Sequence, residues 1–248
     1  MTRSTILLTR PEADCIALSN KLEEKGFNVV HSPMLEIRNI NIPFDIDATN
    51  YDALIFTSKN AVKSFLKQTP DPNTTIQTYA VGPGTAAELK NNGFENIHFS
   101  TQSNAGALIN EIQKNIQSHK KYLYLRGKHI SVNVKQILEQ QNVDVQVDEA
   151  TLYESITNKS IHPDAKSKLI KGEIDYIAFF SERTAKAFNE VINGLELNRT
   201  LFNTKCLCFS DKVLCSVSNL NWQSTHTCKT PTLDSMMNLI DEIETNKA

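Results

Sequence analysis

The sequence predicts an α/β protein built on parallel sheets, and three observations support this. Short apolar runs alternate strictly with amphipathic stretches along all 248 residues, an order typical of strands joined by right-handed helical crossovers. The composition is that of a globular chain, with 40% hydrophobic and 22% charged residues. Segments also repeat weakly about 120 residues apart, which is too long for a solenoid and indicates two copies of one small unit.

Each expected strand is a short apolar run, and each expected helix carries apolar residues on one face. The strands are expected at 5–8, 27–30, 53–56, 78–81, 96–99, 122–125, 143–147, 176–180, 205–209 and 224–227. The helices are expected at 12–25, 60–67, 85–90, 105–117, 131–140, 162–171, 183–191, 211–218 and 233–244. Gly26 is expected to end the first helix in the C′ position, and the third helix is expected to close near Gly93.

The internal repeat gives the domain organisation. The segments that resemble each other are 51–58 with 174–181, 6–10 with 122–126, and 94–112 with 222–240. The last pairing places His98 on His226. Two polar segments, 32–49 and 149–160, are the best candidates for linkers between the two copies.

Charge and cysteine usage exclude several classes of protein. A net charge of −2 and a pI near 6.3 do not fit a nucleic-acid or membrane-surface binder. No apolar run approaches the ~20 residues of a membrane span, and residues 1–14 do not fit a signal peptide. We therefore expect a cytoplasmic protein. The cysteines match no common zinc spacing, so we expect buried reduced thiols and no metal: Cys15, Cys206, Cys208, Cys215 and Cys228.

A hydroxyl, glycine or cation follows each of six expected strands, at the point where a helix begins. Free backbone N–H groups and the positive end of the helix dipole meet there, so each loop fits a carboxylate or phosphate. For any single loop, helix capping is the better reading. A cation beside a helix N-terminus opposes the dipole, so the set as a whole favours anion binding. The loops are Thr9-Arg10, Thr57-Ser58-Lys59-Asn60, Gly82-Pro83-Gly84-Thr85, Arg126-Gly127-Lys128, Ser181-Glu182-Arg183-Thr184 and Ser210-Asp211-Lys212.

Familiar catalytic motifs are absent from the sequence. There is no phosphate-binding P-loop, no dinucleotide fingerprint, no nucleophile elbow and no H-E-x-x-H. No acid/base pair can be assembled from spacing, because the histidines are scattered: His31, His98, His119, His129, His162 and His226. His129 lies beside Arg126 and either reaches a site or is solvated at a helix start.

Six short motifs, in order over the whole chain, resemble the uroporphyrinogen-III synthase family. They are Leu8-Thr9-Arg10-Pro11, the segments 56–62 and 80–86, Leu125-Arg126-Gly127, Leu152-Tyr153-Glu154 and Phe180-Ser181. The loop at 209–213 departs from the G-x-x-T-A pattern frequent in the family, so only Ser210 is carried over from it.

The resemblance implies a fold that periodicity alone does not give. It implies two flavodoxin-like lobes joined by two extended linkers near 32–49 and 149–160. One lobe would combine 1–35 with 156–248, and the other would span 38–150. The family resemblance further implies a cleft between the lobes, closure around the substrate and a monomer.

The implied reaction is cyclisation of hydroxymethylbilane, a linear tetrapyrrole with eight carboxylates, on the route to haem. Water is lost and the terminal pyrrole ring is inverted, giving uroporphyrinogen III. No cofactor, nucleic acid or membrane is involved. The substrate is intrinsically reactive but closes spontaneously to the wrong isomer, so the enzyme must mainly orient it. The residues expected to bind substrate are Thr9, Arg10, Thr57, Ser58, Lys59, Asn60, Gly82, Gly84, Thr85, Arg126, Gly127, Ser181, Arg183, Thr184 and Ser210.

Tyr153 is the one residue expected to take part in the chemistry. The family has a tyrosine in the second linker, and a phenol there can donate a hydrogen bond to the departing hydroxyl. An aromatic anchor for the lobes is the alternative role. For the whole protein, the alternative is a two-lobed small-molecule binding or sensor protein without catalysis, which the lobes and linkers fit equally well.

Overall fold

The computed structural model describes residues 3–42, 50–102, 104–115, 120–141 and 144–246. The chain divides into two compact units: unit 1 is Met1–Glu36 with Ile156–Ala248, and unit 2 is Ile37–Ser155. The sequence placed these divisions at 1–35 plus 156–248 and at 38–150. In each unit a largely parallel sheet lies between helices, which confirms the predicted fold class.

Unit 1 contains a five-stranded sheet in the order β11-β10-β9-β1-β2, with every neighbouring pair parallel. This is the doubly wound order of flavodoxin-like proteins. Its strands are β1 (Thr5–Leu8), β2 (Asn28–His31), β9 (Tyr176–Phe179), β10 (Lys205–Cys208) and β11 (Ser224–Thr227). The helical elements are α1 (Glu12–Glu24), α6 (Pro163–Ile170), α7 (Glu182–Gly194), the short 3-10 helix η2 (Asn198–Leu201), α8 (Asp211–Cys215) and α9 (Leu233–Thr245).

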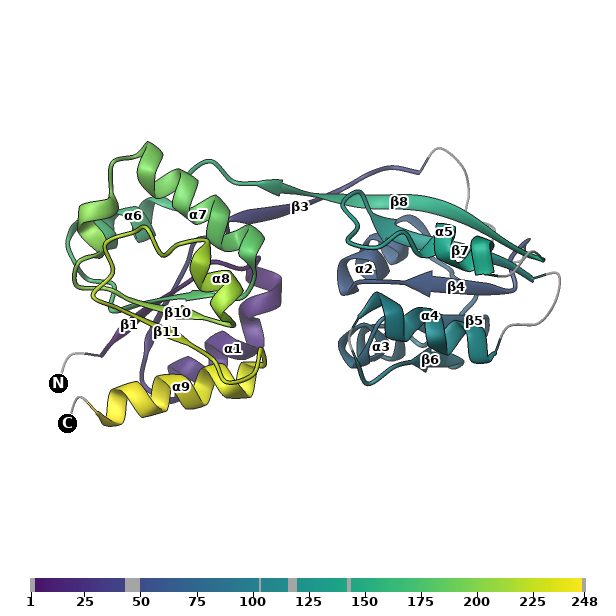
Figure 1. Cartoon of the computed structure of the whole chain (residues 1–248), viewed down its shortest axis with the longest axis horizontal. Coiled ribbons are helices and arrows are strands. Elements are labelled where there is room, and N and C mark those ends of the chain that lie inside the picture. The colour runs from purple at the N-terminus through teal and green to yellow at the C-terminus, as the bar shows by residue number, and fades with distance from the viewer. Residues whose placement is uncertain (1–2, 43–49, 103, 116–119, 142–143, 247–248) are drawn as a thin grey trace. The chain divides into compact units, whose positions relative to one another are not determined.

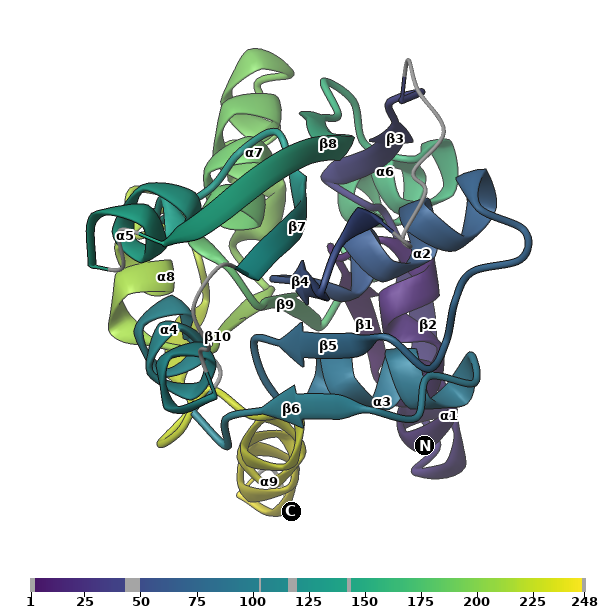
Figure 2. The ribbon, with the colours of Figure 1, turned by 90° about the vertical axis from the view of Figure 1, so that its right-hand side faces the viewer.

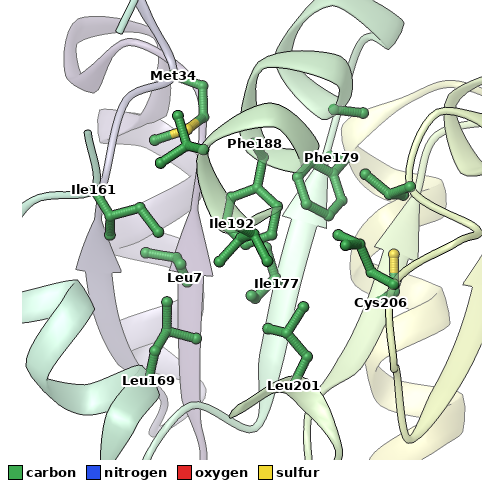
Figure 3. Close-up of a cluster of buried hydrophobic side chains, with 14 of the residues drawn as sticks. Leu7, Met34, Ile161, Leu169, Ile177, Phe179, Phe188, Ile192, Leu201 and Cys206 are labelled. Atoms are coloured by element: carbon green, nitrogen blue, oxygen red, sulfur yellow. The ribbon is translucent and has the colours of Figure 1, made fainter. Parts of the chain in front are cut away.

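The core of unit 1 follows from the two-residue period of its strands. Leu7, Ile177 and Phe179 point to one face, where they pack with side chains of α6 and α7 such as Phe188 (Figure 3). The alternate strand residues face α1 and α9 on the other side of the sheet. Burial on both faces explains why these strands read as continuous apolar runs.

Unit 2 contains a sheet in the order β3-β8-β7-β4-β5-β6, and β5 and β6 run side by side in Figure 2. Its strands are β3 (Leu35–Asn39), β4 (Ala53–Phe56), β5 (Gln77–Ala80), β6 (Ile97–Phe99), β7 (Lys120–Gly127) and β8 (Val145–Thr157). Residues of α2 (Lys59–Gln68) and α3 (Pro83–Asn91) cover one face. Residues of α4 (Ala105–Lys114) and α5 (Val134–Gln141) cover the other.

The two units are related as circular permutations of one fold. In space, β8-β7-β4-β5-β6 matches β2-β1-β9-β10-β11, so the last strand–helix–strand segment of unit 2 matches the first of unit 1. Hydrogen bonds repeat as well: Asp52 Oδ2 accepts from the Lys121 amide at 2.8 Å, and Asp175 Oδ2 from the Thr5 amide at 2.7 Å. The structure therefore confirms the repeat that the sequence predicted.

The expected strands and helices all occur, with ends shifted by a few residues. Three features were missed: β3, η2 and the length of β8. β8 extends to Thr157, through most of the expected linker at 149–160, because β7 and β3 flank it in the sheet. The expected helix end at 117, His119 and linker residues 43–49 lie outside the described residues.

Candidate functional site

In unit 2 a cavity of about 520 Å³ lies at the carboxyl ends of the strands. Sheet order reverses between β4 and β7, and such a switch point is where doubly wound folds bind ligands. Four residues predicted from the sequence line it: Thr57, Ser58, Gly127 and Tyr153. The structure thus brings together residues from β4, β7 and β8 that are up to 96 positions apart.

Tyr153 and Ser58 meet inside this site. Ser58 follows β4 and caps α2, and its Oγ accepts a hydrogen bond from the Ala61 amide at 3.1 Å. The same Oγ lies 2.8 Å from the Tyr153 hydroxyl. The capping role and the site role of Ser58 therefore coexist, because one oxygen serves both contacts.

Gly127 provides the space that the Tyr153 ring occupies. A Cβ at this position would lie 2.6 Å from Tyr153 Cζ and 2.8 Å from the phenolic oxygen. The ladder between β7 and β8 shifts register at Arg126/Gly127, so that Gly127 pairs with Tyr153. Beyond the shift, the Lys128 amide donates to the Tyr153 carbonyl at 2.8 Å. Glycine is therefore required here by close packing.

Tyr124 is a cavity-lining residue that the sequence did not single out. Its hydroxyl lies 3.2 Å from Thr57 Oγ1, and its side chain is buried. Burial raises the pKa of the Tyr124 phenol, against the hydrogen bond from Thr57, which lowers it. The residue was missed because it sits within an apolar run and reads as core.

The start of α4 also lines the cavity and was missed. Asn104 caps this helix by accepting from the Ala107 amide at 2.9 Å. The sequence signal that could have identified this segment was Asn104, a helix-capping residue type at the end of the loop after β6. His129 lines the cavity too, with an exposed side chain, and it precedes the start of α5 at Val134 by five residues.

The glycine loop after β5 lies outside the cavity lining. Gly82 precedes α3 without a side-chain cap, and Thr85 is buried in its first turn. Lys59 is exposed and its chain covers Gly84, where a Cβ would lie 2.9 Å from Lys59 Cε. Asn60, half-buried, follows Lys59 in α2. These predicted residues stay candidates for substrate contact.

Three of the cations at strand ends are already paired with carboxylates. Lys128 Nζ lies 3.0 Å from Glu154 Oε2. Arg126 Nε donates to Glu149 Oε1 at 3.0 Å, and its Nη1 to the Gly127 carbonyl at 3.1 Å. Lys212 Nζ lies 2.8 Å from Glu182 Oε1, a contact that lowers the pKa of Glu182 and raises that of Lys212. The positive charge available to an anion is smaller than the sequence predicted.

In unit 1 the predicted residues fall at the ends of β1, β9 and β10. Thr9 is fully buried and donates to the Ala178 carbonyl at 2.8 Å, so its hydroxyl has a structural partner. Ser181 caps α7 and lies 2.6 Å from the Thr184 hydroxyl, which is also buried. Ser210 caps α8 in the same way.

Arg10 and Arg183 are the remaining predicted cations of unit 1. The guanidinium carbon of Arg10 lies 5.2 Å from the centre of the Phe180 ring. Arg183 lies in the first turn of α7, one residue after Glu182.

Four of the five cysteines are buried, and the expected burial of Cys215 was wrong. Cys206 and Cys208 are buried on β10, as predicted, and Cys15 and Cys228 are buried too, whereas Cys215 is exposed. Among the described residues, no group of three His, Cys, Asp or Glu side chains could hold a metal ion. Within the same residues, no helix is long and apolar enough to cross a membrane.

The fold defines a class: doubly wound α/β proteins with two related sheets, a fold whose members bind ligands where the strand order reverses. A family model described as uroporphyrinogen-III synthase HemD matches residues 16–238. The chain therefore belongs to the uroporphyrinogen-III synthase family.

Individual relatives agree with this. The chain is 28% identical to uroporphyrinogen-III synthase of Chlorobaculum parvum, over 78% of this chain and 81% of that protein. It is 24% identical to the porphyrin biosynthesis protein HemD of Ruminiclostridium josui, over 96% of this chain and 48% of that one. The crystal structure of uroporphyrinogen-III synthetase from Helicobacter pylori has a similar fold, with a TM-score of 0.63 at 21% identity over 97% and 99% of the two chains.

Proposed function

We propose that this protein cyclises hydroxymethylbilane to uroporphyrinogen III, acting as a carbon–oxygen lyase in tetrapyrrole synthesis. The observation that carries the proposal is family membership across residues 16–238. Membership in an enzyme family favours catalysis over the alternative, a binding or sensor protein.

The proposed chemistry begins with loss of the substrate hydroxyl. Electrons from a pyrrole nitrogen expel it, and with one proton it leaves as water, giving an electron-poor azafulvene. The substituted carbon of the terminal ring then attacks, forming a spiro-pyrrolenine whose rearrangement inverts that ring. Because the pyrrole drives the departure, the protein needs to hold the chain and direct the attack.

Tyr153 is the proposed donor to the departing hydroxyl. Its phenol lines the unit 2 cavity, and Ser58 Oγ lies 2.8 Å away. This contact, together with Gly127 against the ring, keeps the hydroxyl in one place. A single positioned acid contributes ~10²–10⁴-fold, and the reactivity of the substrate places Tyr153 at the low end.

Strand-end residues are proposed to hold the substrate carboxylates. In unit 2 these are Thr57, Ser58, Lys59, Asn60, Gly82, Gly84, Thr85 and Gly127. In unit 1 they are Arg10, Ser181, Arg183 and Ser210. Thr9, Thr184 and Arg126 are assigned structural roles, because their polar atoms already have buried or charged partners.

The test is isomer analysis after incubation with hydroxymethylbilane. Type III uroporphyrinogen in excess of the spontaneous type I product supports the proposal, and type I alone contradicts it. We also propose a cytoplasmic monomer, which sedimentation equilibrium and fractionation of cells test.

A further inference from the structure

Two neighbouring strands of unit 1 end in the same dipeptide. Phe180-Ser181 follows β9 and Phe209-Ser210 follows β10, and the strands are parallel and in register. The two rings meet edge to face, with centroids 4.7 Å apart and planes at 80°. Both side chains are only partly buried, so they offer apolar surface where the strands end.

Arg10 completes this surface at the switch point of unit 1. It follows β1, the neighbour of β9, and sheet order reverses between these two strands. Its guanidinium carbon lies 5.2 Å from the centre of the Phe180 ring, within the ~6 Å range of a cation–π contact. Arg10, Phe180 and Phe209 are called the aromatic platform below.

The related position in unit 2 is built differently. There Arg126, the counterpart of Arg10, pairs with Glu149 at 3.0 Å. Glu149 lies opposite Tyr124 in the ladder, and the matching residue of unit 1, opposite Leu8, is His31. Among the side chains that the structure describes, no carboxylate forms an ion pair with Arg10.

The residues of unit 2 that correspond to Phe180 and Phe209 are not aromatic. The register of the two sheets places Thr57 where unit 1 has Phe180, and Val81 where it has Phe209. The repeat has therefore diverged: unit 2 has a cavity at this place, and unit 1 has two aromatic rings beside Arg10, whose guanidinium forms no ion pair with any carboxylate side chain that the structure describes.

We infer that the aromatic platform binds one acidic pyrrole ring of the substrate. The pyrrole packs against Phe180 and Phe209, and a carboxylate on that ring accepts hydrogen bonds from the Arg10 guanidinium. Arginine matches a carboxylate with two parallel donors, and aromatic rings pack favourably edge to face or offset. The inference rests on the proposed function and assigns a ring-binding role to unit 1.

The test compares steady-state constants for hydroxymethylbilane in four variants. Phe180→Leu and Phe209→Leu each raise KM about 2- to 10-fold, the range of an aromatic pair, with kcat changed less. Arg10→Gln raises KM about tenfold or more, as expected for a charge-assisted hydrogen bond. Phe202→Leu is the matched control, because Phe202 is 72% exposed and precedes β10 at the opposite edge of the sheet; its KM stays that of wild type.

Arg10→Gln leaves the apolar core intact, so it tests the carboxylate contact even where a phenylalanine variant fails to melt cooperatively. Unchanged KM in Arg10→Gln, with wild type still producing type III isomer, overturns the inference and the assignment of Arg10 as a carboxylate contact, but leaves the proposed reaction standing. Unchanged KM in both phenylalanine variants overturns the packing of a pyrrole on the aromatic platform. Wild type that yields only type I isomer overturns the proposed function and this inference with it.

Discussion

The Tyr153 hydroxyl lies 2.8 Å from Ser58 Oγ and on the edge of the unit 2 cavity. We expect Tyr153→Phe to lower kcat by at most about 100-fold, because it removes one donor and the pyrrole still expels the leaving group. The product stays type III, since orientation comes from the carboxylate contacts. Steady-state kinetics with isomer analysis checks this.

Tyr51→Phe is the control for that variant. The Tyr51 hydroxyl donates to Asp148 Oδ2 at 3.1 Å. Tyr51 precedes β4, so it lies away from the carboxyl ends of the strands. The control keeps the kcat of wild type. If Tyr153→Phe also behaves as wild type while Tyr153→Ala loses activity or unfolds, Tyr153 is an anchor and not an acid.

Gly127 acts through the ring of Tyr153. The added methyl of Gly127→Ala would lie 2.6 Å from Cζ and must displace the ring. We expect kcat to fall about as far as in Tyr153→Phe. In the double variant, kcat falls by less than the product of the two single-variant factors, because residues that act through one group are coupled.

Gly194→Ala is the control for this cycle. Gly194 lies in α7, and a Cβ there meets no atom within 4 Å. Gly194 is the last residue of α7, and the added methyl group touches nothing, so this variant keeps full activity and melts no lower than wild type. Fully additive losses in the Gly127 cycle would refute the coupling.

Among elements, the starts of α2 and α7 carry serine helix caps that are also proposed substrate contacts. Ser58 and Ser181 each accept an amide hydrogen bond, at 3.1 and 3.2 Å. We expect Ser58→Ala and Ser181→Ala each to cost ~1 kcal/mol of unfolding free energy and to raise KM, as thermal melts and kinetics would show.

Thr232→Ala separates the two effects. Thr232 caps α9 by accepting from the Ser235 amide at 3.2 Å, and α9 follows the edge strand β11. The variant loses similar stability with an unchanged KM. A drop in melting temperature without any rise in KM for the two serine variants would leave them only a capping role.

Asp52, which directly precedes β4, is expected to make the free energy of unfolding depend on pH. Hydrogen bonds from Lys120 and from the Lys121 amide lower the pKa of Asp52. A carboxyl group with a lowered pKa in the folded state stabilises the fold at pH values above its unfolded pKa of ~3.9. This stabilisation is lost as the pH falls through the folded pKa. Asp52→Asn should therefore reduce the slope of unfolding free energy against pH below about pH 5, measured by urea unfolding; an unchanged slope would contradict this.

Local patterns predicted most elements because burial and turns leave local signals. The buried strand 5–8 and Gly26, whose φ of 87° ends α1, were read directly from the sequence. β3 (LEIRN) was missed because only Leu35 and Ile37 are apolar and both are only half-buried, so it reads as part of a polar linker. β8 was predicted too short because its length depends on pairing with β7 and β3, and β3 is distant in sequence. The Ser58–Tyr153 contact was likewise out of reach, since 95 positions separate its partners.

For the whole molecule, a net charge of −2 is compatible with positively charged side chains at the ends of individual strands. We expect KM to rise with ionic strength, because partly exposed carboxylate contacts are screened over ~8–10 Å. Lys212→Gln should follow the same salt curve as wild type, since Lys212 already faces Glu182 at 2.8 Å and is 80% exposed. A KM that does not vary with salt would contradict the role of charge in binding.

The isomer ratio tests the central claim most directly. Purified protein is mixed with hydroxymethylbilane, the products are oxidised, and the porphyrin isomers are separated, with heat-denatured protein giving the spontaneous background. We expect type III to dominate with the folded protein and type I with the denatured one. The same type I product from both would contradict the assignment of this chain as a synthase.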